Sequence, residues 1–245
     1  MIKPFIHLRC LSSYSLSEST LKIKKLVKLA KKNNMPALAI TDNNNMFGVF
    51  EFAQECINNN IQPIIGTSIN LLDIRIKDKI SQLSFLVKNE TGYKNLIYLS
   101  SQSYLNNNSE VGISIEEIEG HSDGLFCFVG GEFNPLMILH NENKDTNDFI
   151  YKLKKLFKNN LLFELQRIND FEIDSFEEDF IQKSKKFNIS LIGTNNIKFG
   201  EEEEFSAHDA LLCVAQKTTI NSANRKTSNN QICFKNDQKM IELFF

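Results

Sequence analysis

The sequence predicts an α/β protein built as one (β/α) barrel domain over residues 1–245. Short apolar runs alternate with segments of helical periodicity along the whole chain. The expected strands are apolar on both faces, which is typical of a parallel sheet covered by helices. At 245 residues the chain is near the upper size for one domain, and barrels routinely fill this length with a single core.

The first third of the chain predicts two strand–helix units. Ile6–Cys10 and Ala37–Thr41 are expected as strands. Ser19 or Thr20 is the expected N-cap of a helix. The apolar positions expected on one face of this helix are Leu21, Ile23, Leu26, Val27 and Ala30. The second helix is expected over Val49–Ile57, and its inward positions are Phe50, Ala53, Cys56 and Ile57.

The remaining two thirds continue the alternation. The expected strands are Ile61–Leu72 around Gly66, Leu83–Val87, Leu125–Val129, Leu161–Gln166 and Leu191–Thr194. The expected helices are Tyr93–Leu105 behind a Thr-Gly turn, Phe149–Phe157, Phe176–Phe187, Ala207–Ala215 and Lys239–Phe244.

Composition disfavours several classes of protein. No apolar run reaches the roughly 18 to 20 residues of a membrane-spanning helix, and the first residues lack a secretory signal, so we expect a cytoplasmic protein with no membrane partner. The five cysteines form no CxxC pair, which favours buried reduced thiols over disulfides or a zinc knuckle. The formal net charge is −2, and the lysines of Lys22–Lys32 are balanced by Glu201–Glu204. A domain that binds nucleic acid alone needs surplus positive charge, so a stand-alone single-stranded DNA binder is disfavoured.

Candidate site residues follow the expected strands. The active site of a (β/α) barrel forms at the carboxyl ends of its strands. The residues at these positions are His7, Arg9, Leu11, Asp42, Asn43, Ser68, Glu164, Arg167, Asn196 and Lys198. This set combines carboxylates and one histidine with cations and neutral side chains, which is unusual for a catalytic centre.

Six segments resemble, in order, the signature segments of a known domain family. They are FIHLRCLSSYSL, MPALAITDNNNMFGVFEF, IQPIIGTSI, NETGYKNLIYLSSQSYL, LIGTNNIKF and FSAHDALLCVAQKTTI. They are similar to the PHP (polymerase and histidinol phosphatase) domain that begins bacterial DNA polymerase III alpha subunits. The resemblance covers essentially the whole chain, and TGYKNL is particular to the polymerase branch.

The resemblance implies a distorted (β/α)7 barrel that, in active members, holds up to three divalent metals such as zinc or manganese for phosphoester hydrolysis. The chain departs from that ligand pattern at most positions. The HxHxH-type start is His7, Arg9 and Leu11, and the TDH segment keeps Asp42 but has Asn43. Other family ligands are replaced by Ser68, Gln82, Gly131, Arg167 or Ile168, Asn196 and Lys198, and only Glu164 stands at a plausible carboxylate position.

A multinuclear metal cluster needs crowded carboxylates and neutral imidazoles, and three plausible ligands are too few. Arg9 and Lys198 are cationic at neutral pH and do not coordinate metals in that state. We therefore hypothesise that they replace the metals electrostatically and pair with Asp42 and Glu164 in a structural salt-bridge network.

The resemblance further implies a catalytically inactive domain of a replicative polymerase, ending before the palm, thumb and fingers. Its expected partners are the rest of the alpha subunit and the proofreading 3'-5' exonuclease subunit, for which it is a scaffold and docking platform. DNA contact and the polymerase's Mg belong to the intact subunit, a DNA-directed DNA polymerase (nucleotidyltransferase), and no cofactor is expected for this domain.

The alternative is a residual metal-dependent phosphoesterase, a 3'-5' exonuclease or pyrophosphatase, that uses His7, Asp42 and Glu164. In a residual phosphoesterase, His7 would be a lone metal ligand. In an inactive domain, it would be a hydrogen-bonded histidine at the end of a strand. His208 is expected to serve packing or capping, and no role is assigned to His121 or His140.

Overall fold

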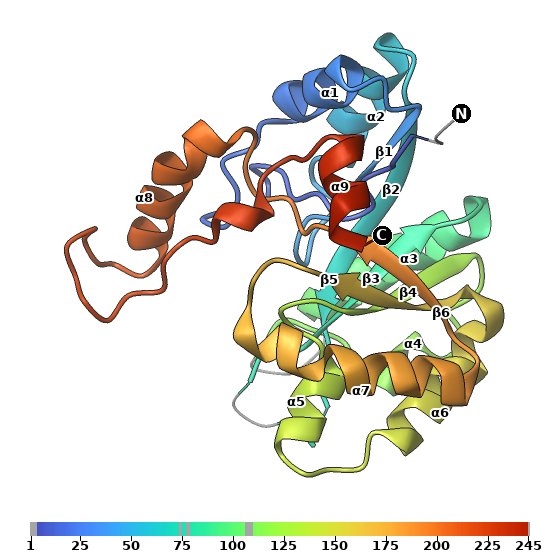
Figure 1. Cartoon of the computed structure of the whole chain (residues 1–245). Helices are drawn as coiled ribbons and strands as arrows, with labels where there is room; N and C mark the ends of the chain where they lie inside the picture. Colours follow the sequence, from blue (N-terminus) through green and yellow to red (C-terminus); the bar gives the residue numbers. More distant parts are fainter. Residues whose placement is uncertain (1–3, 74, 77–78, 106–109, 245) are drawn as a thin grey trace. The chain divides into compact units, whose positions relative to one another are not determined.

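A computed structural model describes residues 4–73, 75–76, 79–105 and 110–244 and shows a mixed α/β fold (Figure 1). Six strands form one sheet in the order of the chain. They are β1 (Ala37–Ile40), β2 (Gln62–Asn70), β3 (Gln82–Val87), β4 (Leu125–Gly130), β5 (Leu161–Gln166) and β6 (Ser190–Thr194). The predicted α/β class is confirmed, whereas the count of seven strands is not.

Helices connect and flank these strands. The α-helices are α1 (Ile23–Lys32), α2 (Val49–Asn58), α3 (Glu90–Leu105), α4 (Ile115–Ile118), α5 (Pro135–Asn141), α6 (Asn147–Phe157), α7 (Phe171–Phe187), α8 (Phe205–Ala215) and α9 (Asp237–Phe244). Short 3-10 turns cover Lys158–Asn160, Glu202–Glu204 and Asn230–Ile232. None of the helices in the described part of the chain has the length and apolar character needed to span a membrane.

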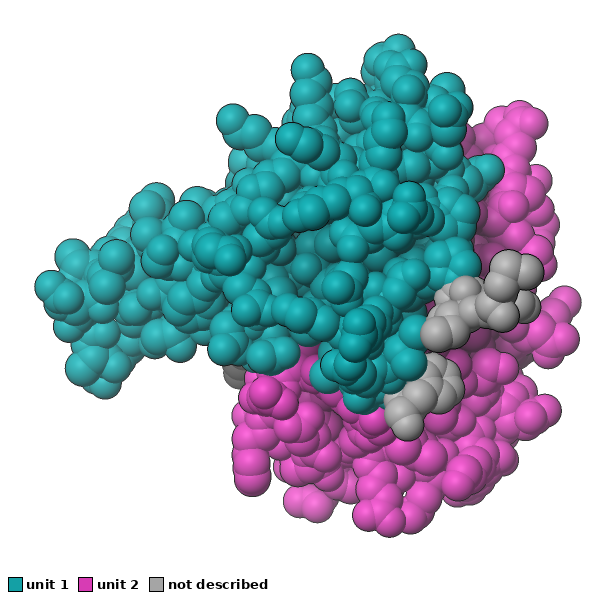
Figure 2. Space-filling view, turned by 45° about the horizontal axis from the view of Figure 1, so that its top comes forward, with its two compact units in different colours: residues 1–42, 47–65, 194–245 teal, residues 43–46, 66–193 magenta. Residues whose placement is uncertain are grey.

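The chain divides into two compact units, coloured teal and magenta in Figure 2. Unit 1 comprises residues 1–42, 47–65 and 194–245, and unit 2 comprises residues 43–46 and 66–193. Strand β2 belongs to both: residues 62–65 pair with β1 in parallel, and residues 66–70 pair with β3 in antiparallel. Each half of β2 therefore builds the sheet of a different unit.

The N-terminal segment of unit 1 is not the predicted strand Ile6–Cys10. Cys10 forms only an isolated parallel bridge with Ile197. The segment nevertheless bonds on both sides, because the Ala39 amide donates to the His7 carbonyl at 3.0 Å and the Leu11 amide donates to the Ile197 carbonyl at 2.9 Å. These bonds are too irregular for a strand, but they hold the His7–Leu11 backbone beside β1.

Helix α1 starts later than predicted, and neither Ser19 nor Thr20 is its cap. The N-cap is Lys22, whose side chain makes no capping bond. The Ser19 hydroxyl instead bonds the carbonyls of Leu11 and Lys198 at 3.0 and 2.8 Å. The predicted apolar face is confirmed, since Ile23, Leu26, Val27 and Ala30 are buried.

Helix α2 has the predicted location but a different buried face. Its buried residues are Val49, Phe52 and Cys56. The predicted inward positions Phe50 and Ile57 are wrong, because their side chains are 74% and 64% exposed. The predicted inward position Cys56 is confirmed, because its side chain is buried.

The strands of unit 2 are not all parallel. β3 runs antiparallel to both β2 and β4, and β4 runs parallel to β5. A parallel connection needs a crossover of about a dozen residues, usually with a helix. Between β2 and β3 the described residues contain no helix. The predicted parallel sheet is therefore wrong around β3.

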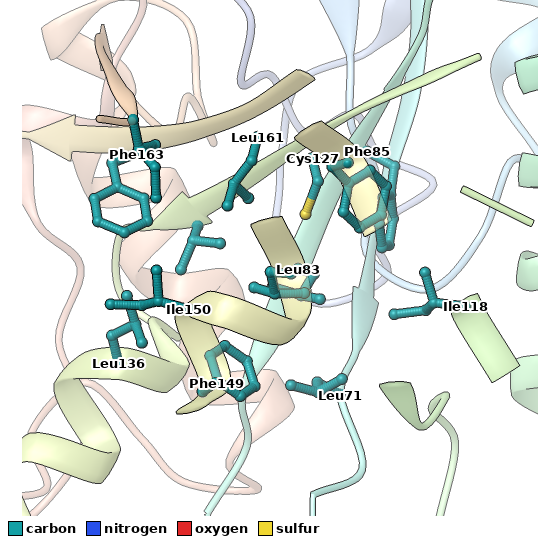
Figure 3. Packing of buried hydrophobic residues seen from close by; sticks show 14 of the residues in the cluster. Leu71, Leu83, Phe85, Ile118, Cys127, Leu136, Phe149, Ile150, Leu161 and Phe163 are labelled. Atoms are coloured by element: carbon teal, nitrogen blue, oxygen red, sulfur yellow. The ribbon is translucent and has the colours of Figure 1, made fainter. Parts of the chain in front are cut away.

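The core of unit 2 packs α4, α5, α6 and α7 against β3, β4 and β5. Figure 3 shows Phe85, Cys127 and Phe163 from the strands together with Phe149 and Ile150 from α6. Helices α4 and α5 were not predicted, although Ser114 forms a capping box and Asn134 caps a helix that begins with Pro135.

Helix α3 includes the residues that were predicted to form a Thr-Gly turn. Thr91 and Gly92 lie in its first turn. A Cβ added at Gly92 would overlap the backbone carbonyl of Gly124. The glycine is thus required by a close approach of two backbones, and the turn assignment is wrong.

Each of the five cysteines is buried and has a free thiol, as predicted.

Candidate functional site

The predicted site residues fall into two groups, one in each unit. His7, Arg9, Leu11, Asp42, Asn196 and Lys198 belong to unit 1. Asn43, Ser68, Gln82, Gly131 and Glu164 belong to unit 2. We describe each group by itself.

The backbone of unit 1 places several of its candidates on one face. Cys10 and Ile197 are bridged in parallel, and both are fully buried. Successive side chains of an extended segment point to opposite faces. Arg9, Leu11 and Lys198 therefore share the face opposite Cys10 and Ile197.

The Asp42 carboxylate is buried and accepts hydrogen bonds from Ser12 and Ser15 of one loop. The Ser12 amide donates to Oδ1 at 2.6 Å, and the Ser12 hydroxyl donates to Oδ2 at 2.7 Å. The Ser15 hydroxyl donates to Oδ1 at 2.6 Å. Burial raises the pKa of Asp42, while these bonds from Ser12 and Ser15 lower it. Sequence reasoning missed Ser12, because its position after the first expected strand carries no ligand signal.

His7 is buried between aromatic rings. Its ring meets Phe5 and Phe234 edge to face, with centroids 5.1 and 4.7 Å away. Nε2 bonds the Lys235 carbonyl at 2.7 Å. Burial lowers the pKa of His7 to about 4, against the opposing effect of this bond, so the ring is neutral at pH 7. Because a carbonyl only accepts, Nε2 holds the proton, and Nδ1 keeps a lone pair with no partner among the described residues.

Lys235 and Asn195 form a second part of this group that the sequence did not indicate. Lys235 is 5% exposed, and its ammonium donates to Asn195 Oδ1 at 2.9 Å and to the Gln231 carbonyl. Asn195 in turn donates to the Cys233 carbonyl at 2.7 Å. Burial lowers the pKa of Lys235. Only the folded chain brings residue 235 beside residue 7, so no local motif could have revealed it.

The two predicted cations of unit 1, Arg9 and Lys198, are 5% and 8% exposed. The Lys198 carbonyl accepts bonds from the Ser19 hydroxyl at 2.8 Å and the Thr20 amide at 3.1 Å. Its neighbour Asn196 adopts a φ of 25°, a left-handed value that asparagine tolerates. Asn196 Oδ1 is buried without a partner among the described residues.

His208 is a buried packing residue of α8. Its Nδ1 bonds the Ser228 hydroxyl at 2.6 Å, and its Nε2 bonds the Glu18 carbonyl at 2.8 Å. The adjacent Asp209 forms a two-pronged pair with Arg225 at 2.8 and 2.7 Å. The Arg225 bonds lower the pKa of Asp209. These contacts fasten the 216–229 loop to α8.

In unit 2, Ser68 and Gln82 line two neighbouring strands. The Ser68 hydroxyl bonds the Ser84 hydroxyl at 3.1 Å, and Asn43 forms a parallel bridge with Ser68. Gln82 Nε2 donates to Asn70 Oδ1 at 3.0 Å. Both side chains are therefore used in bonds to neutral groups.

Gly131 directly follows β4, and Glu164 lies within β5. Gly131 has a φ of 70°, and a Cβ there would lie 2.8 Å from the Gln166 amide. Glu164 is 2% exposed and accepts a bond from Gln166 Nε2 at 2.9 Å. These three residues line a cavity of about 20 Å³ in unit 2, which has room for one water molecule.

Arg167 and Ile168, one of which was predicted to replace a family histidine, both have structural contacts in unit 2. Arg167 pairs with Glu177 at 2.7 Å, and this bond raises its pKa. Ile168 is buried.

The donor set does not fit a multinuclear metal cluster. Within residues 4–73, 75–76, 79–105 and 110–244, no three histidine, cysteine, aspartate or glutamate side chains are grouped to hold an ion. Both Asp42 oxygens accept bonds from Ser12 or Ser15, and His7 Nε2 is committed to a carbonyl.

Comparison with known proteins identifies the family. The PHP domain family matches residues 7–168. The DNA polymerase III subunit alpha of Rickettsia conorii is 36% identical over 246 residues, which are 98% of this chain and 20% of that protein. The same subunit of Borreliella burgdorferi is 33% identical over 253 residues, covering 98% of this chain and 22% of that protein. The chain thus spans about a fifth of the length of these curated relatives.

Solved structures agree in fold. A protein of Bifidobacterium adolescentis described as a metal-dependent phosphoesterase aligns with a TM-score of 0.50 at 13% identity, over 98% of this chain and 96% of that one. An amidohydrolase of Chromobacterium violaceum aligns with a TM-score of 0.50 at 12% identity, over 79% of this chain and 87% of that one. With the family match over residues 7–168, the chain belongs to the PHP domain family.

Proposed function

We propose that this chain is the N-terminal PHP domain of a DNA polymerase III alpha subunit and that it is catalytically inactive. The support is the similarity of nearly the whole chain to alpha subunits, at 30–36% identity. Those relatives are about five times longer, so DNA synthesis and its Mg would belong to a longer protein. The domain would then act in cytoplasmic DNA replication as a scaffold.

The state of Asp42 carries the proposal of inactivity. Its carboxylate corresponds to the aspartate of the family's TDH segment, and here it accepts bonds from Ser12 and Ser15. An ionised carboxylate in this cage is already stabilised by charge-assisted bonds and gains less from a cation. The sequence positions of Arg9 and Lys198, where the family has histidines, favour the same conclusion. We propose that these two cations balance the charge of Asp42 in place of metals.

A docking role follows from the loss of hydrolytic chemistry. If the domain does not edit DNA, a separate proofreading 3'-5' exonuclease subunit must do so, and we propose that this domain binds it. The resemblance to alpha subunits supports this partner.

The competing function is a residual phosphoesterase. Its support is the neutral His7, whose Nδ1 retains a buried lone pair. A neutral imidazole nitrogen is a good ligand for zinc or manganese. Together with Asp42 it would hold one ion.

Incubation of the purified chain with manganese and DNA labelled at its 3' end separates the two functions. We expect no release of label above the level of the Asp42→Ala and His7→Gln variants. Manganese-dependent release that both substitutions abolish, in variants that keep the wild-type circular dichroism, would establish the phosphoesterase instead.

A further inference from the structure

Unit 1 exposes four large apolar side chains around α2. We call Leu16, Phe47, Phe50 and Ile57 the α2 ridge. Their side chains are 78%, 71%, 74% and 64% exposed. Single exposed apolar residues are ordinary, but several on one element indicate an interaction surface.

The two ridge residues within α2 lie on one side of the helix. Phe50, Gln54 and Ile57 follow each other at intervals of four and three residues, so they form one stripe, and Phe47 lies just before the helix. Val49, Phe52 and Cys56 are buried on the other side. Helix α2 is thus apolar on two faces, and only one of them is covered within unit 1.

Leu16 belongs to a loop that is held firmly beside the start of α2. Ser12 and Ser15 anchor the loop on Asp42. The Tyr14 ring lies against Gly48, where an added Cβ would be 2.7 Å from its Cδ2 atom. The Tyr14 hydroxyl donates to Glu51 Oε2 at 3.1 Å. A fixed apolar surface loses little entropy on binding.

One flank of the ridge is acidic. On α2, Glu51 is exposed and Glu55 is half-buried, and the two lie one helical turn apart beside Gln54. An apolar stripe flanked by carboxylates is complementary to a segment with apolar anchors and flanking lysines or arginines.

We propose that the α2 ridge is the surface on which an apolar, basic segment of the exonuclease subunit docks. This inference rests on the proposed docking function and adds the surface and the chemistry of the partner segment. A second copy of the chain fits less well, because a symmetric contact would bring Glu51 and Glu55 near their own copies. Anionic lipid would be repelled by the same carboxylates.

The test measures binding of the full chain to the purified exonuclease subunit of the same cell by isothermal titration calorimetry. Phe50→Ser and Leu16→Ser should each raise the dissociation constant at least about tenfold, since exposed aromatic and aliphatic anchors dominate such interfaces. Glu51→Lys should raise the dissociation constant and flatten its dependence on salt concentration. The matched control is Phe171→Ser, which changes an 86% exposed side chain of unit 2 and should bind like the wild type.

The outcomes separate the surface from the function. Wild-type binding that Phe50→Ser and Leu16→Ser leave unchanged would overturn the ridge and keep the docking function. No binding by the wild type would overturn both. A dimer of the wild-type chain that Phe50→Ser dissociates would assign the ridge to self-association and contradict the proposal.

Discussion

Asp42 illustrates how a metal-ligand position can be used for structure. A buried carboxylate is costly unless hydrogen bonds satisfy it. Ser12 and Ser15 provide these bonds and at the same time fold the 12–19 loop around the carboxylate. The Asp42 side chain therefore fixes the 12–19 loop, whereas a metal-binding aspartate would direct its oxygens to the ion.

Replacing Ser12 or Ser15 by alanine should destabilise the protein by about 1–3 kcal/mol each, because one carboxylate oxygen loses a buried donor. Urea unfolding at pH 7 measures the change. Ser175→Ala is the control, since its exposed hydroxyl bonds only a helix carbonyl at 3.0 Å. A loss for Ser12→Ala no larger than for this control would contradict the role of the loop.

The neutral His7 predicts a pH dependence of stability. Its pKa is about 4 in the folded chain, below the ordinary histidine value of 6.5. The unfolded chain therefore binds the extra proton between these values, and stability is full above about pH 6.5 and falls as pH drops toward 4. The loss is of the order of 3 kcal/mol.

Urea unfolding at pH 7 and pH 5 measures this effect. His7→Gln keeps an Nε2 donor for the Lys235 carbonyl but does not titrate, so the difference between variant and wild type isolates His7. Equal pH slopes for the two proteins would show that His7 is protonated as easily in the folded chain as in the unfolded one.

The candidate site could be located from the sequence only in part. The rule of strand ends found His7, Asp42 and Glu164, which the structure shows buried. It could not find Lys235, because a contact between residues 7 and 235 depends on how distant segments pack. The pairing of Arg9 and Lys198 with the carboxylates stays a prediction.

At the scale of the elements, long periodic segments were the predictable ones. α6, α8, β4 and β5 lie where periodicity placed them, with ends shifted by a few residues at most. The strand predicted over Ile6–Cys10 is wrong, because its apolar pattern matches a strand while its backbone hydrogen bonds are shared irregularly between two neighbouring segments. The direction of β3 failed because direction depends on the connection, which an apolar pattern does not encode.

At Gly92 in α3, the addition of one methyl group is expected to lower the free energy of unfolding strongly. Gly92→Ala should destabilise the protein by about 3 kcal/mol, because the added Cβ overlaps the Gly124 carbonyl and backbone cannot move aside cheaply. Thermal and urea unfolding measure it. Gly120→Ala is the matched control: it has a φ of 90° but no atom within 4 Å, so only about 1 kcal/mol of backbone strain is expected. Similar losses for both variants would contradict the packing argument.

At the scale of the whole molecule, charge predicts weak contact with nucleic acid. The net charge is −2, and three lysines that could meet phosphate pair with glutamates instead, namely Lys25, Lys32 and Lys239. We expect no salt-dependent rise in the fluorescence anisotropy of a labelled single-stranded oligonucleotide at micromolar protein. A rise that disappears with added salt would show that the chain binds DNA by itself.

The claim that the ligand set no longer holds metal has one direct test. Crystals of the chain grown with manganese should show no anomalous peak at coordination distance from the Asp42 oxygens or from His7 Nδ1, and the Ser12 and Ser15 bonds should remain. A fully occupied manganese ion bound to these atoms would contradict the account and assign the domain a metal-dependent chemistry.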